Sequence, residues 1–127
     1  MEWNFRNDLP IYSQLVEQIK LGIVSGEFSP GQRLASVRDM AMEAGVNPNT
    51  MQRALQELER EGMVYSQRTA GRFVTEDSTV IANVKKAFAE EQIQGFLEAM
   101  NKLGYSRREI ISLLEEKEEE TNADLGV

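Results

Sequence analysis

The chain has 127 residues, a hydrophobic fraction of 41% and a formal net charge of −7, which suits one ordinary folded domain with an appendage. It contains no cysteine and no histidine, which excludes disulfides, thiolate or imidazole metal sites, a cysteine nucleophile and the commonest general base. No run of about 18 apolar residues is present and the N-terminus lacks a signal-peptide pattern, so we expect a cytoplasmic protein with no membrane partner, metal or other cofactor.

Apolar residues recur at helical spacing near the N-terminus, and the pattern predicts a core-facing helix over 10–25. Gly26 follows at the point where the chain must turn to end that helix. Arg33 and Leu34 can then form a brief strand. The residues of the helical stripe are Ile11, Leu15, Ile19 and Ile23, with Tyr12 and Val16 beside them.

Two helices with strong start signals follow in close succession. Ser36 and Asp39 match a capping box, in which the serine hydroxyl accepts from the amide three residues on and the carboxylate returns to the serine amide. This helix ends at Gly45. Asn47 is a good cap for the next helix, which has a proline at its first position and ends at Gly62. Because only about two residues separate the helices, they must cross sharply.

A small hairpin is predicted after these helices. Strand-prone residues at 63–65 and 73–74 flank the turn sequence RTAG at 68–71, and this pattern is typical of two short paired strands. Arg68 and Arg72 lie on either side of the turn. Two sharply crossed helices followed by such a hairpin predict a winged helix-turn-helix, a module that reads DNA.

Two further helices are predicted in the tail. The first carries a broad apolar face from Val80 to Leu103, and Ser106 with Glu109 forms a second capping box that opens the other. The acidic end EEKEEETNADLGV is expected to be frayed and solvated. We therefore predict a mainly α fold with a small β-hairpin, divided into a DNA-binding domain over 1–75 and a helical dimerisation tail over 76–127.

The apolar face of the tail is too extensive to leave in water. It can pair with a second copy of the chain, or it can pack only on its own DNA-binding domain. We favour the homodimer, because two helices alone bury too little surface for independent stability. The predicted dimer interface consists of Val84, Phe88, Phe96, Leu97, Met100, Ile110, Ile111 and Leu114.

The charge is divided unevenly along the chain. Residues 1–75 hold eight Lys and Arg against nine Asp and Glu, whereas residues 76–127 hold six against twelve. The acid therefore lies mainly in the tail, and a DNA-binding surface in the first part is compatible with an acidic protein. The same overall acidity also suits an alternative, a protein-interaction adaptor with a winged fold that does not bind DNA.

The second crossed helix is the candidate reading element, because the N-terminal residues of such a helix reach base edges in the major groove. Gln52 or Asn49 can bind an adenine edge through two hydrogen bonds, and Arg53 can reach a guanine or a phosphate. Asn47 either contacts DNA or only caps its helix. Arg38 either contacts DNA or pairs with a neighbouring acid.

The hairpin supplies a second set of candidate contacts. Arg68 and Arg72 can lie along a narrow minor groove, where the negative potential is enhanced, and Gly71 permits close approach of the backbone. The complete candidate DNA-binding set is Ser36, Arg38, Asn47, Asn49, Thr50, Gln52, Arg53, Arg68, Gly71 and Arg72.

Residues 10–74 resemble the N-terminal domain of the GntR family of transcriptional regulators. The matching segments are PIYSQL, GEFSPGQRLASVRDMA, GVNPNTMQRALQELEREGMV and GRFV. Ala35 stands where the family usually has proline, and Thr69 replaces the first glycine of the usual hairpin turn. The resemblance implies a winged-helix fold and DNA contacts at Arg38, Asn47, Asn49, Thr50, Gln52, Arg53 and Gly71.

The short helical tail is similar to that of the YtrA-type branch of this family, whose tails dimerise and whose members often regulate transporter operons. The expected function is therefore that of a homodimeric regulator, most simply a repressor, on a palindromic operator in double-stranded DNA. Whether a small-molecule effector exists is left open. An enzyme is disfavoured, because the chain has no histidine, no cysteine and no recognisable cluster of carboxylates. The contiguous acids of EEKEEE project in different directions around a helix and are read as a solvated helix end and not as a metal site.

Overall fold

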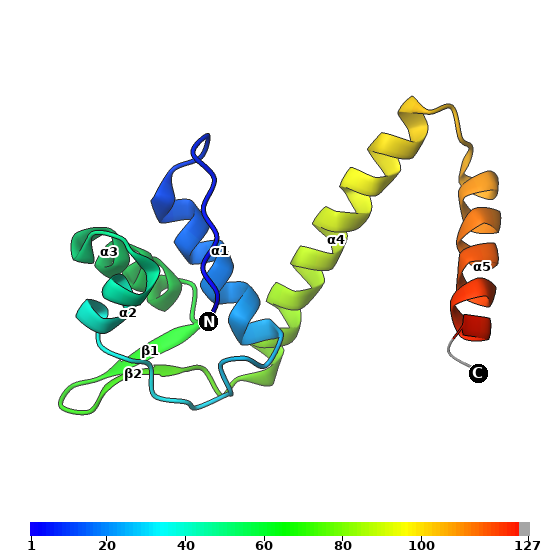
Figure 1. The fold of residues 1–127 in the computed structure, drawn as a ribbon. Helices are drawn as coiled ribbons and strands as arrows, with labels where there is room; N and C mark the ends of the chain where they lie inside the picture. Colours follow the sequence, from blue (N-terminus) through cyan, green and yellow to red (C-terminus); the bar gives the residue numbers. More distant parts are fainter. Residues whose placement is uncertain (125–127) are drawn as a thin grey trace. The chain divides into compact units, whose positions relative to one another are not determined.

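The computed structural model describes residues 1–124, which form five helices and one two-stranded antiparallel hairpin (Figure 1). The predicted fold class, mainly α with a small hairpin, is confirmed. The elements in chain order are α1 (Ile11–Val24), α2 (Val37–Ala44), α3 (Pro48–Arg60), β1 (Val64–Gln67), β2 (Gly71–Val74), α4 (Ser78–Lys102) and α5 (Arg107–Asp124).

The chain divides into two compact units, Met1–Ala87 and a second that begins at Phe88. The division falls inside α4, beyond the boundary expected near residue 75, because Val80, Ile81 and Val84 pack against the core of the first unit. The first turns of α4 are therefore part of the domain that carries the hairpin.

The core of the first unit forms where α1 packs against α3. Leu15, Ile19 and Ile23 on α1 are at most 2% exposed, as is Leu58 on α3. Ile11 was predicted to join this stripe, but it is 37% exposed. Helical side chains point back toward the N-terminus, so the side chain at the first helical position projects beyond the helix end instead of into the core.

Side-chain caps fix the start of α2 and of α3. The Ser36 hydroxyl accepts a hydrogen bond from the Asp39 amide at 3.1 Å, and Asn47 Oδ1 accepts from the Asn49 amide at 2.8 Å. Of the predicted capping box, only the bond to the serine hydroxyl is present among the described residues. Gly45 ends α2 with φ +71°, a conformation that favours glycine. The predicted pair of capped helices is confirmed.

A third segment of the chain, at Arg33 and Leu34, pairs with the β2 edge of the hairpin. β1 and β2 pair in the register Val64↔Val74 to Gln67↔Gly71, and Arg33 forms a bridge to Phe73 on the other side of β2. The Leu34 amide donates to the Arg72 carbonyl at 2.9 Å. The segment predicted as a brief strand therefore forms an isolated antiparallel bridge to β2.

The hairpin turn closes without a glycine at Thr69. The Ala70 amide donates to the Gln67 carbonyl at 3.1 Å, and every positive φ in the described residues belongs to a glycine. The turn therefore follows an ordinary backbone path in which a threonine is unstrained. The departure from the family's glycine changes the turn chemistry but does not prevent the hairpin.

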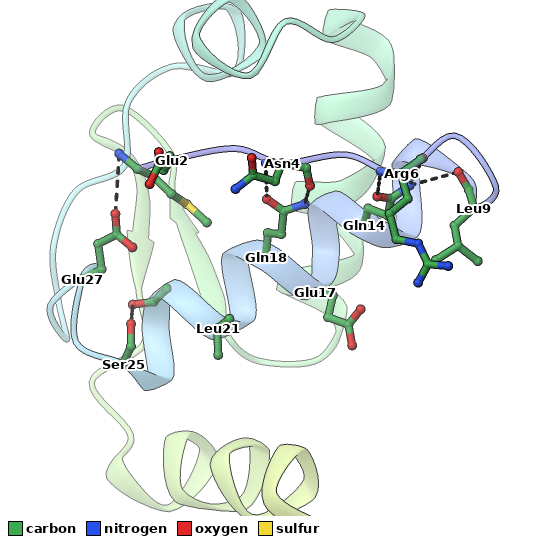
Figure 2. A pocket seen from close by; sticks show the side chains of 12 residues that line it. Glu2, Asn4, Arg6, Leu9, Gln14, Glu17, Gln18, Leu21, Ser25 and Glu27 are labelled. Carbon is green, nitrogen blue, oxygen red and sulfur yellow. Dashed lines mark hydrogen bonds and ion pairs between the residues drawn. The ribbon is translucent and has the colours of Figure 1, made fainter. Parts of the chain in front are cut away.

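An N-terminal arm, residues 1–9, lies along α1 (Figure 2). Gln18 exchanges hydrogen bonds with the backbone of Asn4 at 3.2 and 2.6 Å, and Gln14 does the same with Arg6 at 2.7 and 2.9 Å. The Met1 ammonium lies 3.4 Å from Glu43, and this hydrogen bond raises its pKa. The arm and α1 border an open groove of about 780 Å³. Two glutamines one helical turn apart thus hold the extended N-terminal arm on α1 through hydrogen bonds to its backbone.

The α5 helix begins with a complete capping box. The Ser106 amide donates to the Glu109 carboxylate at 3.1 Å, and the Glu109 amide donates to the Ser106 hydroxyl at 3.2 Å. The helix then continues through Asp124, which corrects the expectation that the acidic end is frayed over its described part. Glu, Lys and Ala are strong helix formers, and Lys117 pairs with Glu120 at 3.5 Å. Residues 125–127 of that segment lie outside the described residues.

Acid is expected to weaken the start of α5. The hydrogen bonds from the amide and hydroxyl of Ser106 lower the pKa of Glu109, so the box stabilises the helix above the unfolded-state pKa and loses that contribution as pH falls through the folded-state value. Circular dichroism from pH 7 to about pH 3 measures this when wild type is compared with Glu109→Gln. The variant lacks this titration, so identical acid profiles would contradict the prediction.

Candidate nucleic-acid interface

The α3 helix has one buried and one polar face. Met51, Ala54, Leu55 and Leu58 are at most 1% exposed, and they hold the helix on the core at i, i+3, i+4 and i+7 spacing. The opposite face, at the N-terminal half of the helix, presents the predicted reading residues. Asn47, Asn49 and Arg53 are exposed, whereas Thr50 and Gln52 are half-buried.

Arg53 is held in place by an aromatic ring. Its guanidinium carbon lies 4.0 Å from the ring centroid of Tyr12 on α1, a distance at which the cation is attracted to the ring face. Sequence reasoning placed Tyr12 in the core stripe. The ring does pack at the edge of the core, but its exposed face positions a cation on the reading helix.

Arg38 is exposed in the first turn of α2. The neighbouring acids Asp39 and Glu43 were the alternative partners for it. Glu43 instead pairs with the Met1 ammonium at 3.4 Å, and no ion pair to Arg38 occurs within the described part of the chain. Its guanidinium is therefore available to a ligand from outside the chain.

The two hairpin arginines have different settings. Arg68 is exposed in the turn, whereas Arg72 is half-buried. Successive residues of a strand point to opposite faces, so Arg72 shares a face with buried Val74. From this face its Nη1 donates to Gln52 Oε1 on α3 at 3.5 Å. The structure thus joins the hairpin to the reading helix through two of the predicted residues.

The backbone conformation and the close neighbours of position 71 both favour a glycine there. Its φ of +107° is one that side-chain-bearing residues rarely adopt, and a Cβ at this position would lie 3.2 Å from Arg33 Nε. Arg33 is itself exposed and thereby approaches the hairpin tip on the face opposite Arg72. The signal for it was the predicted brief strand, because pairing of that strand with β2 brings Arg33 to the hairpin.

The cations near the far end of α3 are neutralised within the chain. Arg60 pairs with Glu57, and this interaction raises the pKa of the arginine and lowers that of the glutamate. Lys20 on α1 pairs with Glu61 at 2.8 Å. Among the described residues of the first unit, the arginines that form no ion pair are Arg33, Arg38, Arg53, Arg68 and Arg72, and four of these five belong to the predicted DNA-binding set.

The predicted dimer residues are not equally accessible. Val84 packs against the core of the first unit, and Ile110 is 3% exposed within its own chain. Phe88, Leu97 and Met100 are half-buried. The remaining predicted residues are exposed, together with others outside the predicted set. The exposed apolar surface of α4, the α4–α5 turn and α5 comprises Ile93, Phe96, Leu103, Tyr105, Ile111, Leu113 and Leu114.

The described residues contain no cluster of acidic side chains suited to a metal ion. None of the described helices is both long and apolar enough to cross a bilayer. The capped pair α2–α3 and the hairpin beside it form a winged helix-turn-helix. In this class of protein the second helix of the pair enters the major groove of DNA.

Residues 11–74 match the family described as bacterial regulatory proteins, gntR family. The chain is 38% identical over 111 residues to YhcF of Bacillus subtilis, an uncharacterized HTH-type transcriptional regulator, with 87% of this chain and 92% of YhcF covered. It is 37% identical over 90 residues to YtrA of B. subtilis, an HTH-type transcriptional repressor, with 70% and 69% covered. The chain belongs to the GntR family and is of the short YtrA type.

Solved structures agree with this assignment. A GntR-family transcriptional regulator from Listeria monocytogenes superposes with a TM-score of 0.81 at 37% identity, covering 88% of this chain and 98% of that one. The DNA-binding domain of AraR, solved in complex with its operator ORX1, matches 59% of this chain and 96% of that one, with a TM-score of 0.54 at 29% identity. The protein is a DNA-binding transcriptional regulator and not an enzyme.

Proposed function

We propose that the protein acts as a homodimeric repressor that occupies a palindromic operator in double-stranded DNA. In this proposal the N-terminal half of α3 lies in the major groove, Ser36 and Arg38 contact DNA from α2, and the hairpin contacts the adjacent minor groove. The DNA-contacting residues are proposed to be Ser36, Arg38, Asn47, Asn49, Thr50, Gln52, Arg53, Arg68, Gly71 and Arg72.

One observation carries the proposal above the others: Arg53 and Arg72, which form no ion pair among the described residues, lie with Gln52 at the N-terminal half of α3. Arg53 is fixed by Tyr12 at 4.0 Å, and Arg72 meets Gln52 at 3.5 Å. Arginine and amide side chains are the ones that read base edges and phosphates. Two acidic residues near the C-terminal end of α3, Glu57 and Glu61, pair with Arg60 and Lys20 and not with these arginines.

A binding titration at several salt concentrations tests DNA binding by this surface. Phosphate contacts release counterions, so affinity for an operator fragment should fall steeply between about 50 and 200 mM salt. Arg53→Ala should weaken binding while the fold and the oligomeric state stay unchanged. Salt-independent binding, or loss of the fold in Arg53→Ala, would contradict the surface assignment.

The homodimer is proposed from the second unit. Its exposed residues Phe96, Ile111 and Leu114, 41 to 53% exposed, lie in a region where only Ile110 reaches the buried class among the described residues. Large apolar side chains left in water in this number mark an interaction surface. A two-fold dimer binds half-sites about one helical turn apart, so a pseudo-palindromic operator follows from the same proposal.

The repressor role rests on the similarity to YtrA, which is named a transcriptional repressor. A transporter operon as the regulated target, and action in the cytoplasm where a bacterial regulator meets the chromosome, are further parts of the proposal. Deletion of the gene should raise transcription of the operon that carries the operator. A fall in that transcription would show an activator instead.

Loss of the Tyr12 ring is expected to weaken operator binding through Arg53. Tyr12→Leu removes a cation–π contact worth about 0.5–1 kcal/mol and frees the guanidinium before binding. Tyr12→Phe keeps the ring and serves as the matched control. Fluorescence anisotropy with labelled operator measures both variants. Equal losses for the two substitutions, or a full effect of Tyr12→Leu in an Arg53→Ala background, would contradict this role.

A further inference from the structure

Arg72 lies between the hairpin and the recognition helix instead of extending from the hairpin tip. The register pairs it with Ser66, one pair nearer the turn than Phe73 and two pairs from Val74. Because side chains alternate along a strand, Arg72 shares the face of Val74, which is fully buried. The guanidinium is thereby directed toward α3, where it meets Gln52.

The contact with Arg72 fixes which way the Gln52 amide is turned. A guanidinium carries only donors, whereas a glutamine amide has one oxygen acceptor and one NH₂ donor. Only Oε1 can therefore face Arg72, and the distance from Nη1 to this oxygen is 3.5 Å. The NH₂ group of Gln52 is left to interact with whatever lies in front of the helix.

No protein group competes with Gln52 for this arginine in the described residues. Arg72 Nε is buried and has no hydrogen-bond acceptor there, and no carboxylate forms an ion pair with the guanidinium. The carbonyl oxygen of Gln52 is consequently the one protein side-chain acceptor that Arg72 has within the described chain. The side of the Gln52 amide that faces the hairpin is therefore its carbonyl oxygen.

We propose that Arg72 determines which base edge Gln52 reads, by holding its carbonyl oxygen and leaving its NH₂ group as a donor. This rests on the proposed contact of Gln52 with DNA. A guanine edge offers two acceptors, N7 and O6, whereas an adenine edge offers N7 beside an N6 amino group that needs an acceptor. With one lone pair of Oε1 engaged by Arg72 and the NH₂ group directed away from the hairpin, Gln52 can donate to the two acceptors of guanine. The two-bond adenine contact that sequence reasoning allowed requires the same oxygen to accept from N6 as well, so guanine is preferred.

The test selects bound sequences from random duplex DNA with wild type and three variants. Gln52→Ala identifies the operator position that Gln52 faces, because base preference is lost there. At that position wild type should favour guanine over adenine by about fivefold or more, the lower range for a good base contact. Arg72→Met, of similar length but without donors, should shift the ratio toward adenine by a similar factor. Arg68→Met, in the same hairpin, should lower affinity without moving this ratio.

The outcomes separate the two proposals. If wild type enriches no sequence, the proposed operator binding fails. If wild type enriches an operator but Arg72→Met leaves the guanine-to-adenine ratio unchanged, or Arg68→Met shifts it equally, only the role of Arg72 is overturned. Should Arg72→Met fail to fold, 7-deazaguanine at the same position with wild-type protein replaces it. Loss of N7 should lower affinity severalfold, and unchanged affinity would overturn the inference.

Discussion

Replacing Ile111 and Leu114 together by glutamate is expected to convert the proposed dimer to a monomer and to lower operator affinity by roughly 100- to 10,000-fold. Both side chains are exposed in the chain by itself, at 45 and 53%, so their replacement should leave the fold of each unit intact. Charges in an apolar interface cannot be solvated when the copies pair. Loss of pairing removes the second half-site contact, whose gain in affinity is of this order.

Analytical ultracentrifugation and anisotropy on the same samples measure the two effects. Ser112→Glu places a charge on the same helix at an exposed position that carries no apolar side chain, so it controls for charge alone. The double variant should sediment as a monomer, and Ser112→Glu should sediment as the proposed dimer. A double variant that remains dimeric, or a monomer that binds the operator as tightly as wild type, would contradict the proposed role of the tail.

Replacing Arg38 by alanine should weaken operator binding. If Arg38 contacts a base, the expected loss is about 1–3 kcal/mol per half-site. If Arg38 contacts a phosphate, the loss should be smaller and independent of sequence, and affinity should depend less steeply on salt concentration. The expected loss follows from its position in the first turn of α2, which crosses the DNA backbone in this class, and from its lack of an acidic partner in the described chain.

Arg60→Ala is the matched control for Arg38→Ala. Arg60 is also an exposed helical arginine, but it pairs with Glu57 at the opposite end of α3. Its removal should leave operator affinity within about twofold of wild type, since exposed ion pairs contribute little. An equal loss from both substitutions would indicate that binding responds to net charge and not to the proposed surface.

The boundaries of α2 and α3 were predictable from the sequence because local chemistry sets them. Ser36 and Asn47 accept from the amides that begin α2 and α3, and Gly45 and Gly62 adopt the positive φ values that end those helices. Such signals lie within a few residues of each other, so one sequence contains them in full. The same applies to Ser106, whose box opens α5.

The pairings within the candidate site were not predictable in this way. Tyr12 and Arg53 are separated by 41 residues, and Gln52 and Arg72 by 20, so their contacts depend on how α1 and the hairpin pack on α3. The strand pattern gives two possible faces for Arg72, and the register that selects one is fixed by the turn and by burial of Val74. Burial therefore decided which polar residues meet.

The most direct test of the account is selection of bound duplexes from a random library with the full wild-type chain. We predict one enriched pseudo-palindrome whose half-sites lie about 10 bp apart, bound by two chains in a sedimentation experiment on the selected duplex. Enrichment of a single half-site bound by one chain would contradict the dimeric mechanism. Absence of any enriched sequence would contradict operator recognition itself.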